Sequence, residues 1–281
     1  MANVSGIRTV SVDENVLSEF MSTKRLFCGM PFVVNEYLVL EFNNELIGPY
    51  RWNGNSFIEV PFQQFTSTQF GTIKPRNKDP YQMAYMDSLD RNQLTFCTGP
   101  AGSGKTQLAL GYAFQQLEKG KLDRIVIFCN PMIATQAVRL GFLPGTRDEK
   151  LLESSIGSIL LSKLGGRLAV DRLIQSEELI LMPMGDCRGY EPPPNSFVYF
   201  TEAQNTSRYL MQLFLQRQTD ESKICVEGDT KQVDSSSFEN GLNGLTRAIE
   251  VFKGEDYAGH VRLEHIYRGR IAQRAEMIFD D

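Results

Sequence analysis

Apolar residues along the chain fall into two textures, and the change between them lies near residue 73. In the first part, the segment 37–42 is a short apolar run typical of a strand, and the pair 43–44 is typical of a turn. An Asn-Gly pair at 53–54 lies between apolar segments, which indicates a hairpin. These patterns predict a small β-rich domain over residues 1–73.

The second texture covers residues 74–281, where short apolar runs alternate with helical patterns. Strands are expected at 94–97, 125–128, 179–182, 197–200, 224–226 and 261–263. A helical pattern at 105–117 follows the first of these strands. The alternation favours an α/β fold with a parallel sheet flanked by helices. The segment 71–80, with two prolines and several basic residues, is expected to be a linker.

Composition narrows the class of protein. The 281 residues include 29 Lys+Arg and 34 Asp+Glu, and 42% are hydrophobic, as in an ordinary globular chain. No apolar run approaches the length of a membrane span, so we expect no membrane partner and a cytoplasmic location. The cysteine spacing and the two histidines argue against a zinc site. The net charge of −5 argues against broad electrostatic capture of nucleic acid but leaves a local basic groove open.

One motif carries the clearest chemistry. The pattern G-x-x-x-x-G-K-[ST] lies between a predicted strand and a predicted helix. Its glycines permit close approach of phosphates to backbone N–H groups, Lys105 places a charge on the β/γ-phosphates, and the Thr106 hydroxyl coordinates Mg²⁺. The alternative is a chance glycine-rich turn. The expected nucleotide-binding residues are Gly99, Pro100, Ala101, Gly102, Ser103, Gly104, Lys105, Thr106 and Gln107.

An acidic residue follows the predicted strand 197–200. Glu202 has the position of a Walker B acid, where a carboxylate reaches the Mg²⁺ shell through water or polarises the attacking water. The preceding residue is Thr201, whose hydroxyl could hold a metal-bound water but carries no charge. The alternative for Glu202 is a helix N-terminal acid stabilised by the helix dipole.

A polar loop follows the predicted strand 224–226. It begins with Gly228-Asp229 and reaches Gln232, whose amide could orient water or sense the γ-phosphate. The alternative is an ordinary polar connection without a functional role.

Taken together, the motifs resemble those of the PhoH family of P-loop ATPases, over roughly residues 79–281. The matching pieces, in the family's order, are Gly99–Thr106, Gly141-Phe-Leu-Pro-Gly145 with Glu149-Lys150, Cys187-Arg-Gly189, Glu202-Ala-Gln-Asn205 and Gly228-Asp-Thr-Lys-Gln232. The short N-terminal region and brief C-terminus look like the versions carried by bacteriophages.

The resemblance implies a RecA-like core related to superfamily 1 helicases, ATP as nucleotide, Mg²⁺ as metal and a hexameric ring. It implies that Glu202 activates water and that Gln232 senses the γ-phosphate. By the same resemblance, Gln82 looks like the family's adenine-reading glutamine, with a solvated helix residue as the alternative. The sequence departs from the family at Thr201, where the family has Asp.

The resemblance also points to a C-terminal arginine finger. Arg268 is preferred to Arg270, with Arg188 as a further candidate and a solvated basic face as the alternative. In a ring, the finger is expected to come from the neighbouring subunit.

Two classes of function follow. The first is an ATPase, related to helicases, that acts on RNA or single-stranded DNA. The residues give it one local support, basic side chains near two tyrosines, a combination that suits single strands but is also typical of a solvated linker: Lys74, Arg76, Lys78, Tyr81 and Tyr85. The second is an ATP-gated oligomeric switch with slow or no hydrolysis, which Thr201 favours. A small-molecule kinase is a weaker third hypothesis, and the guanine-reading motif of GTPases does not occur.

Overall fold

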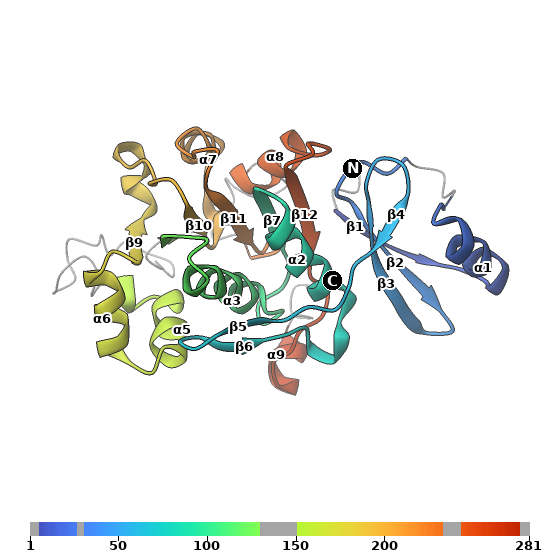
Figure 1. Cartoon of the computed structure of the whole chain (residues 1–281), viewed down its shortest axis with the longest axis horizontal. Coiled ribbons are helices and arrows are strands. Elements are labelled where there is room, and N and C mark those ends of the chain that lie inside the picture. The colour runs from blue at the N-terminus through green and yellow to red at the C-terminus, as the bar shows by residue number, and fades with distance from the viewer. Residues whose placement is uncertain (1–5, 27–30, 130–150, 233–242, 276–281) are drawn as a thin grey trace.

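The protein is described by a computed structural model at residues 6–26, 31–129, 151–232 and 243–275. Its centre is a six-stranded parallel sheet in the order β12-β7-β11-β10-β8-β9 (Figure 1). Every strand expected in the second part of the chain is present. The strands are β7 (Leu94–Thr98), β8 (Arg124–Cys129), β9 (Leu179–Pro183), β10 (Ser196–Phe200), β11 (Lys223–Gly228) and β12 (Ala258–Arg262).

Helices cover both faces of this sheet, which explains why its strands are continuously apolar. In β10, Phe197 and Tyr199 belong to one core cluster, and Val198 and Phe200 belong to the other. In Figure 1, α7 (Arg208–Leu215) and α8 (Gly244–Val251) lie above the sheet. On the opposite side lie α2 (Pro80–Arg91), α3 (Lys105–Glu118), α5 (Ser155–Lys163) and α6 (Arg167–Gln175). The remaining short helical segments are η1 (Arg76–Lys78), η3 (Met184–Gly189), η4 (Ala203–Asn205) and α9 (Arg270–Ala275). The predicted α/β fold, a RecA-like P-loop core with a β-rich N-terminal region, is confirmed.

The N-terminal region forms a separate four-stranded sheet at the right of Figure 1. The predicted turn at Asn43-Asn44 joins β2 to β3, and both residues have positive φ, as a tight hairpin requires. The predicted Asn-Gly hairpin joins β3 to β4. The elements are β1 (Ile7–Ser11), α1 (Glu14–Thr23), β2 (Tyr37–Phe42), β3 (Glu45–Trp52) and β4 (Phe57–Glu59).

Strand β2 is buried on both faces, and this fixes the N-terminal sheet to the rest of the chain. Leu38 and Leu40 pack with Phe20 of α1 in a cluster of their own. Tyr37 and Val39, on the opposite face, belong to the cluster that contains α2 and α3. The sheet therefore shares a hydrophobic core with the P-loop domain.

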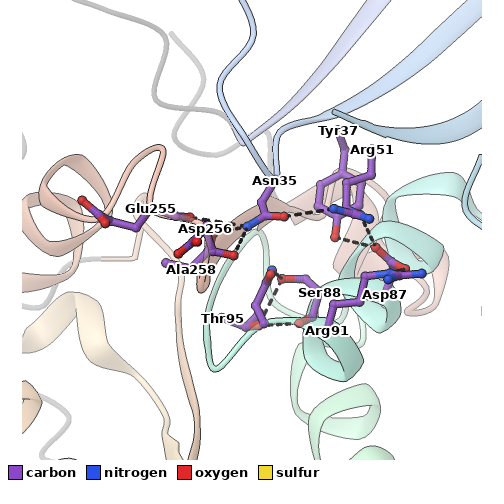
Figure 2. Close-up of polar contacts among 11 residues, drawn as sticks. Asn35, Tyr37, Arg51, Asp87, Ser88, Arg91, Thr95, Glu255, Asp256 and Ala258 are labelled. Carbon is purple, nitrogen blue, oxygen red and sulfur yellow. Dashed lines mark hydrogen bonds and ion pairs between the residues drawn. The ribbon is translucent and has the colours of Figure 1, made fainter. Parts of the chain in front are cut away.

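Polar contacts reinforce this joint, as Figure 2 shows. Asp87 of α2 accepts a hydrogen bond of 3.0 Å from the Tyr37 hydroxyl and pairs with Arg51 at 3.4 Å. Asn35 donates from its amide to the backbone carbonyls of Asp256, just before β12, and Ala258, its first residue, at 3.0 Å each. Segments far apart in the sequence thus meet beside α2.

The segment expected to be a linker is partly a strand. β6 (Gly71–Ile73) pairs with β5 (Phe65–Ser67) in a short hairpin that lies on α3 (Figure 1). Phe65 packs edge to face with Tyr112, and Phe70 stacks on Phe114 at 5.0 Å. These aromatic contacts hold the hairpin against the P-loop domain, although it precedes residue 74. The predicted domain boundary after residue 73 stays a prediction.

Candidate functional site

The glycine-rich loop connects β7 directly to α3. Gly99, Gly102 and Gly104 have φ values of +145°, +82° and +99°, and Gly104 is the N-cap of the helix. Side chains rarely adopt these conformations, so the glycines of the motif are required by the turn itself. The loop therefore turns its backbone at the N-terminus of a helix of three to four turns, a favourable place for phosphate.

Lys105 begins α3, and its side chain lies across the loop. Its Nζ donates hydrogen bonds to the carbonyls of Gly99 at 2.7 Å and Pro100 at 3.2 Å. Ser103 is buried and also donates to the Pro100 carbonyl, at 2.8 Å. These hydrogen bonds hold the Lys105 ammonium group at the loop, where it can contact the negative oxygens of a bound phosphate.

The loop borders a pocket of about 640 Å³, a volume typical of small-ligand sites. Its lining includes the loop residues Ala101, Gly102, Gly104, Lys105, Thr106 and Gln107 but not Gly99, Pro100 or Ser103. Lining cations outnumber lining acids, which favours a polyanion: the cations are Lys74, Arg76, Lys105, Lys163 and Arg268, and the acids are Glu202, Glu227 and Asp229.

The predicted Walker B residues, Thr201 and Glu202, directly follow β10. Glu202 has φ +57° and ψ +36°, a left-handed conformation that a residue without special stabilisation avoids. Its Oε2 accepts a hydrogen bond of 2.7 Å from the Gln204 amide, whose own oxygen accepts from the backbone N–H of Asp229 at 3.1 Å. The Glu202 carboxylate is therefore positioned at the pocket by a short chain of bonds that reaches the end of β11.

Glu227 of β11 is a site residue that the sequence reasoning missed. Its Oε1 accepts hydrogen bonds from Thr106 and from Thr201, both at 3.0 Å. The side chain is 3% exposed and lines the pocket. Burial raises the pKa of this carboxyl, and the nearby charge of Lys105 opposes part of that rise. The only sequence signal was an acid directly before Gly228-Asp229, at the end of an apolar strand.

Gln82 of α2 lies beside the loop, as a nucleotide-binding role requires, but both ends of its amide are engaged. Its Nε2 donates to the Ser103 carbonyl, and its Oε1 accepts from the backbone N–H of Arg76, at 2.8 Å each. It is 4% exposed, which differs from a solvated helix residue. Its adenine-reading role stays a prediction.

Arg268 lies against the loop of its own chain. A Cβ on Gly102 would come within 2.5 Å of the Arg268 Cγ, and the neighbouring Tyr267 N–H donates to the Gly102 carbonyl at 3.0 Å. Arg268 lines the pocket, whereas Arg270 and Arg188 do not. The structure thus brings one of the three candidate arginines to the phosphate loop without a second subunit.

Two predictions remain, the role of Gln232 and the motif pieces between β8 and α5. Gln232 lines the pocket, and its backbone N–H bonds to the Asp229 carbonyl at 3.1 Å. The motif pieces at 141–145 and 149–150 lie outside the described residues.

The expected single-strand surface is not formed as predicted. Tyr81 and Tyr85 are 6% and 0% exposed, so neither ring can stack on a base. The Tyr81 hydroxyl bonds to Thr9, and the Tyr85 hydroxyl lies 3.1 Å from the Cys225 Sγ. The reason is that α2 lies between the N-terminal sheet and the central sheet, so almost its whole surface is covered.

The arrangement can bind a phosphate chain and prepare water for attack on it. The loop N–H groups and Lys105 meet negative oxygens, Thr106 and Glu227 offer oxygen ligands to a divalent cation, and Glu202 can act as a base. The described helices include none that is long and apolar enough to span a bilayer.

Comparison with known proteins agrees with the geometry. The family model described as "PhoH-like protein" matches residues 72–280. Relatives include a "PhoH-like protein" of Mycobacterium bovis, 32% identical over 70% of this chain and 54% of its own, and one of Bacillus subtilis, 32% identical over 67% and 58%. "Protein PhoH" of Escherichia coli K12 is 30% identical over 69% of this chain and 54% of its own.

The chain thus spans little more than half the length of these relatives. A solved structure, "Crystal Structure of DUF1998 helicase MrfA bound to DNA", aligns with 73% of this chain and 28% of its own at a TM-score of 0.39 and 8% identity, which is too remote to carry an argument. The family match over residues 72–280 and the phosphate loop within it establish that the chain belongs to the PhoH family.

Proposed function

We propose that this chain binds ATP with Mg²⁺ and hydrolyses it. One observation carries the proposal: the ends of β7, β10 and β11 bring Lys105, Thr106, Glu202 and Gln232 to the wall of a single pocket. These are the groups that phosphoryl transfer to water needs, namely a phosphate cradle, a metal ligand, a base and a polar side chain that can orient water.

In this proposal each side chain has one task. Lys105 and the loop N–H groups hold the β- and γ-phosphates, and Thr106 binds Mg²⁺. Glu202 accepts a proton from the attacking water, and Gln232 orients that water or senses the γ-phosphate. Bound Mg²⁺ supplies charge neutralisation at the phosphates. In this proposal Thr201 holds a metal-bound water, and Gln82 supports the loop from α2 through its hydrogen bond to the Ser103 carbonyl.

We also propose that Arg268 stabilises the developing charge from within its own subunit. The support is its packing against Gly102 and its place in the pocket lining. This replaces the expectation of a finger from a neighbouring subunit.

Family membership is the support for the wider role. On that ground we propose a ring-forming ATPase, related to superfamily 1 helicases, that acts on RNA or single-stranded DNA in the cytoplasm, or in the host cytoplasm if a phage encodes it. The side chains give little support for action on nucleic acid, because Tyr81 and Tyr85 are buried and Lys74 and Arg76 line the proposed nucleotide pocket.

A second candidate is an ATP-gated oligomeric switch with slow or no hydrolysis. The feature that favours it is Thr201, an uncharged side chain where the resemblance to the family implies Asp. ATP-dependent assembly without phosphate release would support this candidate.

The experiment is phosphate release by the wild type and by Glu202→Gln, each with and without single-stranded RNA. Loss of the base is expected to lower turnover by roughly 10²- to 10⁴-fold, with ATP affinity retained. Stimulation by RNA that weakens steeply with salt would support action on nucleic acid. Turnover by Glu202→Gln at the wild-type rate would refute the assignment of the base.

A further inference from the structure

Thr201 and Glu227, which follow and end two neighbouring strands, are joined by a hydrogen bond between their side chains. Thr201 stands where the resemblance to the family implies an acid, and its hydroxyl donates to the Glu227 carboxylate at 3.0 Å. The Thr106 hydroxyl donates to the same oxygen, also at 3.0 Å. A carboxylate is therefore present between the two threonines, although it comes from another strand.

The order of the strands explains how Glu227 reaches this point. β11 lies between β7, which leads into the phosphate loop, and β10, which ends at the Walker B residues. In the register of the sheet Val226 is level with Phe200, and Glu227 is level with Cys97. Residue 227 therefore lies beside residue 201, and an acid at either position enters the same space.

The two oxygens of the Glu227 carboxylate are not equally hydrogen-bonded. Its Oε2 is buried and accepts no well-formed hydrogen bond among the described residues, although the neighbouring Tyr199 hydroxyl opposes part of the rise that burial causes in the pKa of this carboxyl. Lys105, whose charge acts on this carboxyl, gives its hydrogen bonds to the carbonyls of Gly99 and Pro100. Because an unpaired buried charge is costly, such a group calls for a cation or a proton.

We propose that Glu227 supplies, from β11, the Mg²⁺-facing carboxylate that Thr201 lacks. The donor set fits the ion, since Mg²⁺ prefers hard oxygen ligands and uses one or two carboxylates together with phosphates and water. Thr106 and Glu227 would hold the ion, directly or through water, and Thr201 positions the carboxylate. The inference rests on the proposed binding of ATP at the loop.

The test is the effect of Mg²⁺ on the affinity for a fluorescent, non-hydrolysable ATP analogue, measured in Mg²⁺ and in EDTA. We expect Glu227→Gln to lose about 10- to 100-fold of the Mg²⁺-dependent affinity, the range seen when a metal site loses such a group. Affinity in EDTA should stay equal or improve, because a negative charge beside the phosphates is gone.

The exchange variant Thr201→Asp with Glu227→Thr provides the matched control. It returns the carboxylate from β10 and is expected to recover the Mg²⁺ effect, which a misfolded or merely unstable Glu227→Gln protein could not explain. Titration of the wild type and both variants with Mn²⁺ in the presence of the analogue, followed by electron paramagnetic resonance, reports metal binding without any turnover.

The outcomes separate the two claims. If the wild type binds no analogue in either condition, the proposed function fails and this inference fails with it. If the wild type binds and Glu227→Gln retains the full Mg²⁺ effect, only the inference is overturned, and Glu227 is a structural carboxyl that ties β11 to α3.

Discussion

Two buried carboxylates in this chain have nearly equal exposure but different partners. Asp87 is 5% exposed and Glu227 is 3% exposed. Asp87 accepts from the Tyr37 hydroxyl and lies beside the guanidinium groups of Arg51 and Arg91 (Figure 2). Glu227 receives two hydroxyl hydrogen bonds on one oxygen and, among the described residues, none on the other.

The difference separates a structural acid from one that is suited to bind a ligand. Burial of a charge is offset at Asp87 by two cations that belong to the fold, so this acid can join the N-terminal sheet to α2. Glu227 forms no ion pair with a cation of the described part of the chain, and it lines the pocket. It is suited to a cation that arrives with the nucleotide.

The largest effect is expected at the pocket that Lys105 and Glu227 both line. Lys105→Ala removes the loop's charge and should lower ATP turnover by at least about 10³-fold, on the scale of other single charges that stabilise phosphoryl transfer. The free energy of unfolding, measured in urea, should change little, because the hydrogen bonds of the ammonium group to the described residues go to its own loop. Unchanged turnover would remove the site from this pocket.

Arg268→Ala tests whether the site is complete within one chain. Turnover should fall by roughly 10³-fold, because a guanidinium no longer meets the transition-state charge, while analogue affinity stays within a few fold. Mixing this variant with Lys105→Ala should not restore activity, since each chain would need its own arginine. Recovery on mixing would assign the arginine to a neighbouring subunit.

Asp87→Ala tests the other carboxylate. It leaves Arg51 unpaired at the joint, so the free energy of unfolding should fall by about 3 kcal/mol. The Mg²⁺ effect on analogue affinity should be unchanged, in contrast to Glu227→Gln. Equilibrium urea unfolding and analogue titration check both parts. A loss of Mg²⁺ dependence in Asp87→Ala would erase the distinction between the two acids.

The smallest effect is a pH dependence of stability in the absence of metal and nucleotide. Burial raises the pKa of Glu227 above its ordinary value of 4.5, so the folded state binds the proton more tightly than the unfolded state. Its contribution to stability is therefore present at low pH and declines as pH rises through the raised pKa. Relative to Glu227→Gln, the wild type should lose about 1 kcal/mol for each pH unit of that shift.

Urea unfolding of both proteins in EDTA, from about pH 5 to pH 8, measures this difference. Parallel curves for the wild type and Glu227→Gln would show that the carboxyl is not perturbed in the free protein.

Much of the fold could be predicted because its signals are local. The strands of the central sheet are buried on both faces and are therefore apolar runs, and the phosphate loop is contiguous in sequence. Glu227 could not be found in this way. Its partners lie 121 and 26 residues away along the chain, and only the position of β11 between β7 and β10 brings them together.

Two other errors have related causes. The β5–β6 hairpin has strands of only three residues and owes its place to the aromatic side chains of α3, not to its own pattern. Tyr81 and Tyr85 were expected beside a basic surface, but α2 is buried between the central sheet and the N-terminal sheet. The sequence pattern of a helix does not show that a second sheet packs on it.

The most direct test of the account is steady-state phosphate release from ATP by the wild type in Mg²⁺ and in EDTA, with Lys105→Ala as the blank. The account predicts turnover in Mg²⁺ that disappears in EDTA and in the blank. Release at the same rate by the wild type and the blank, or turnover that does not depend on Mg²⁺, would contradict it.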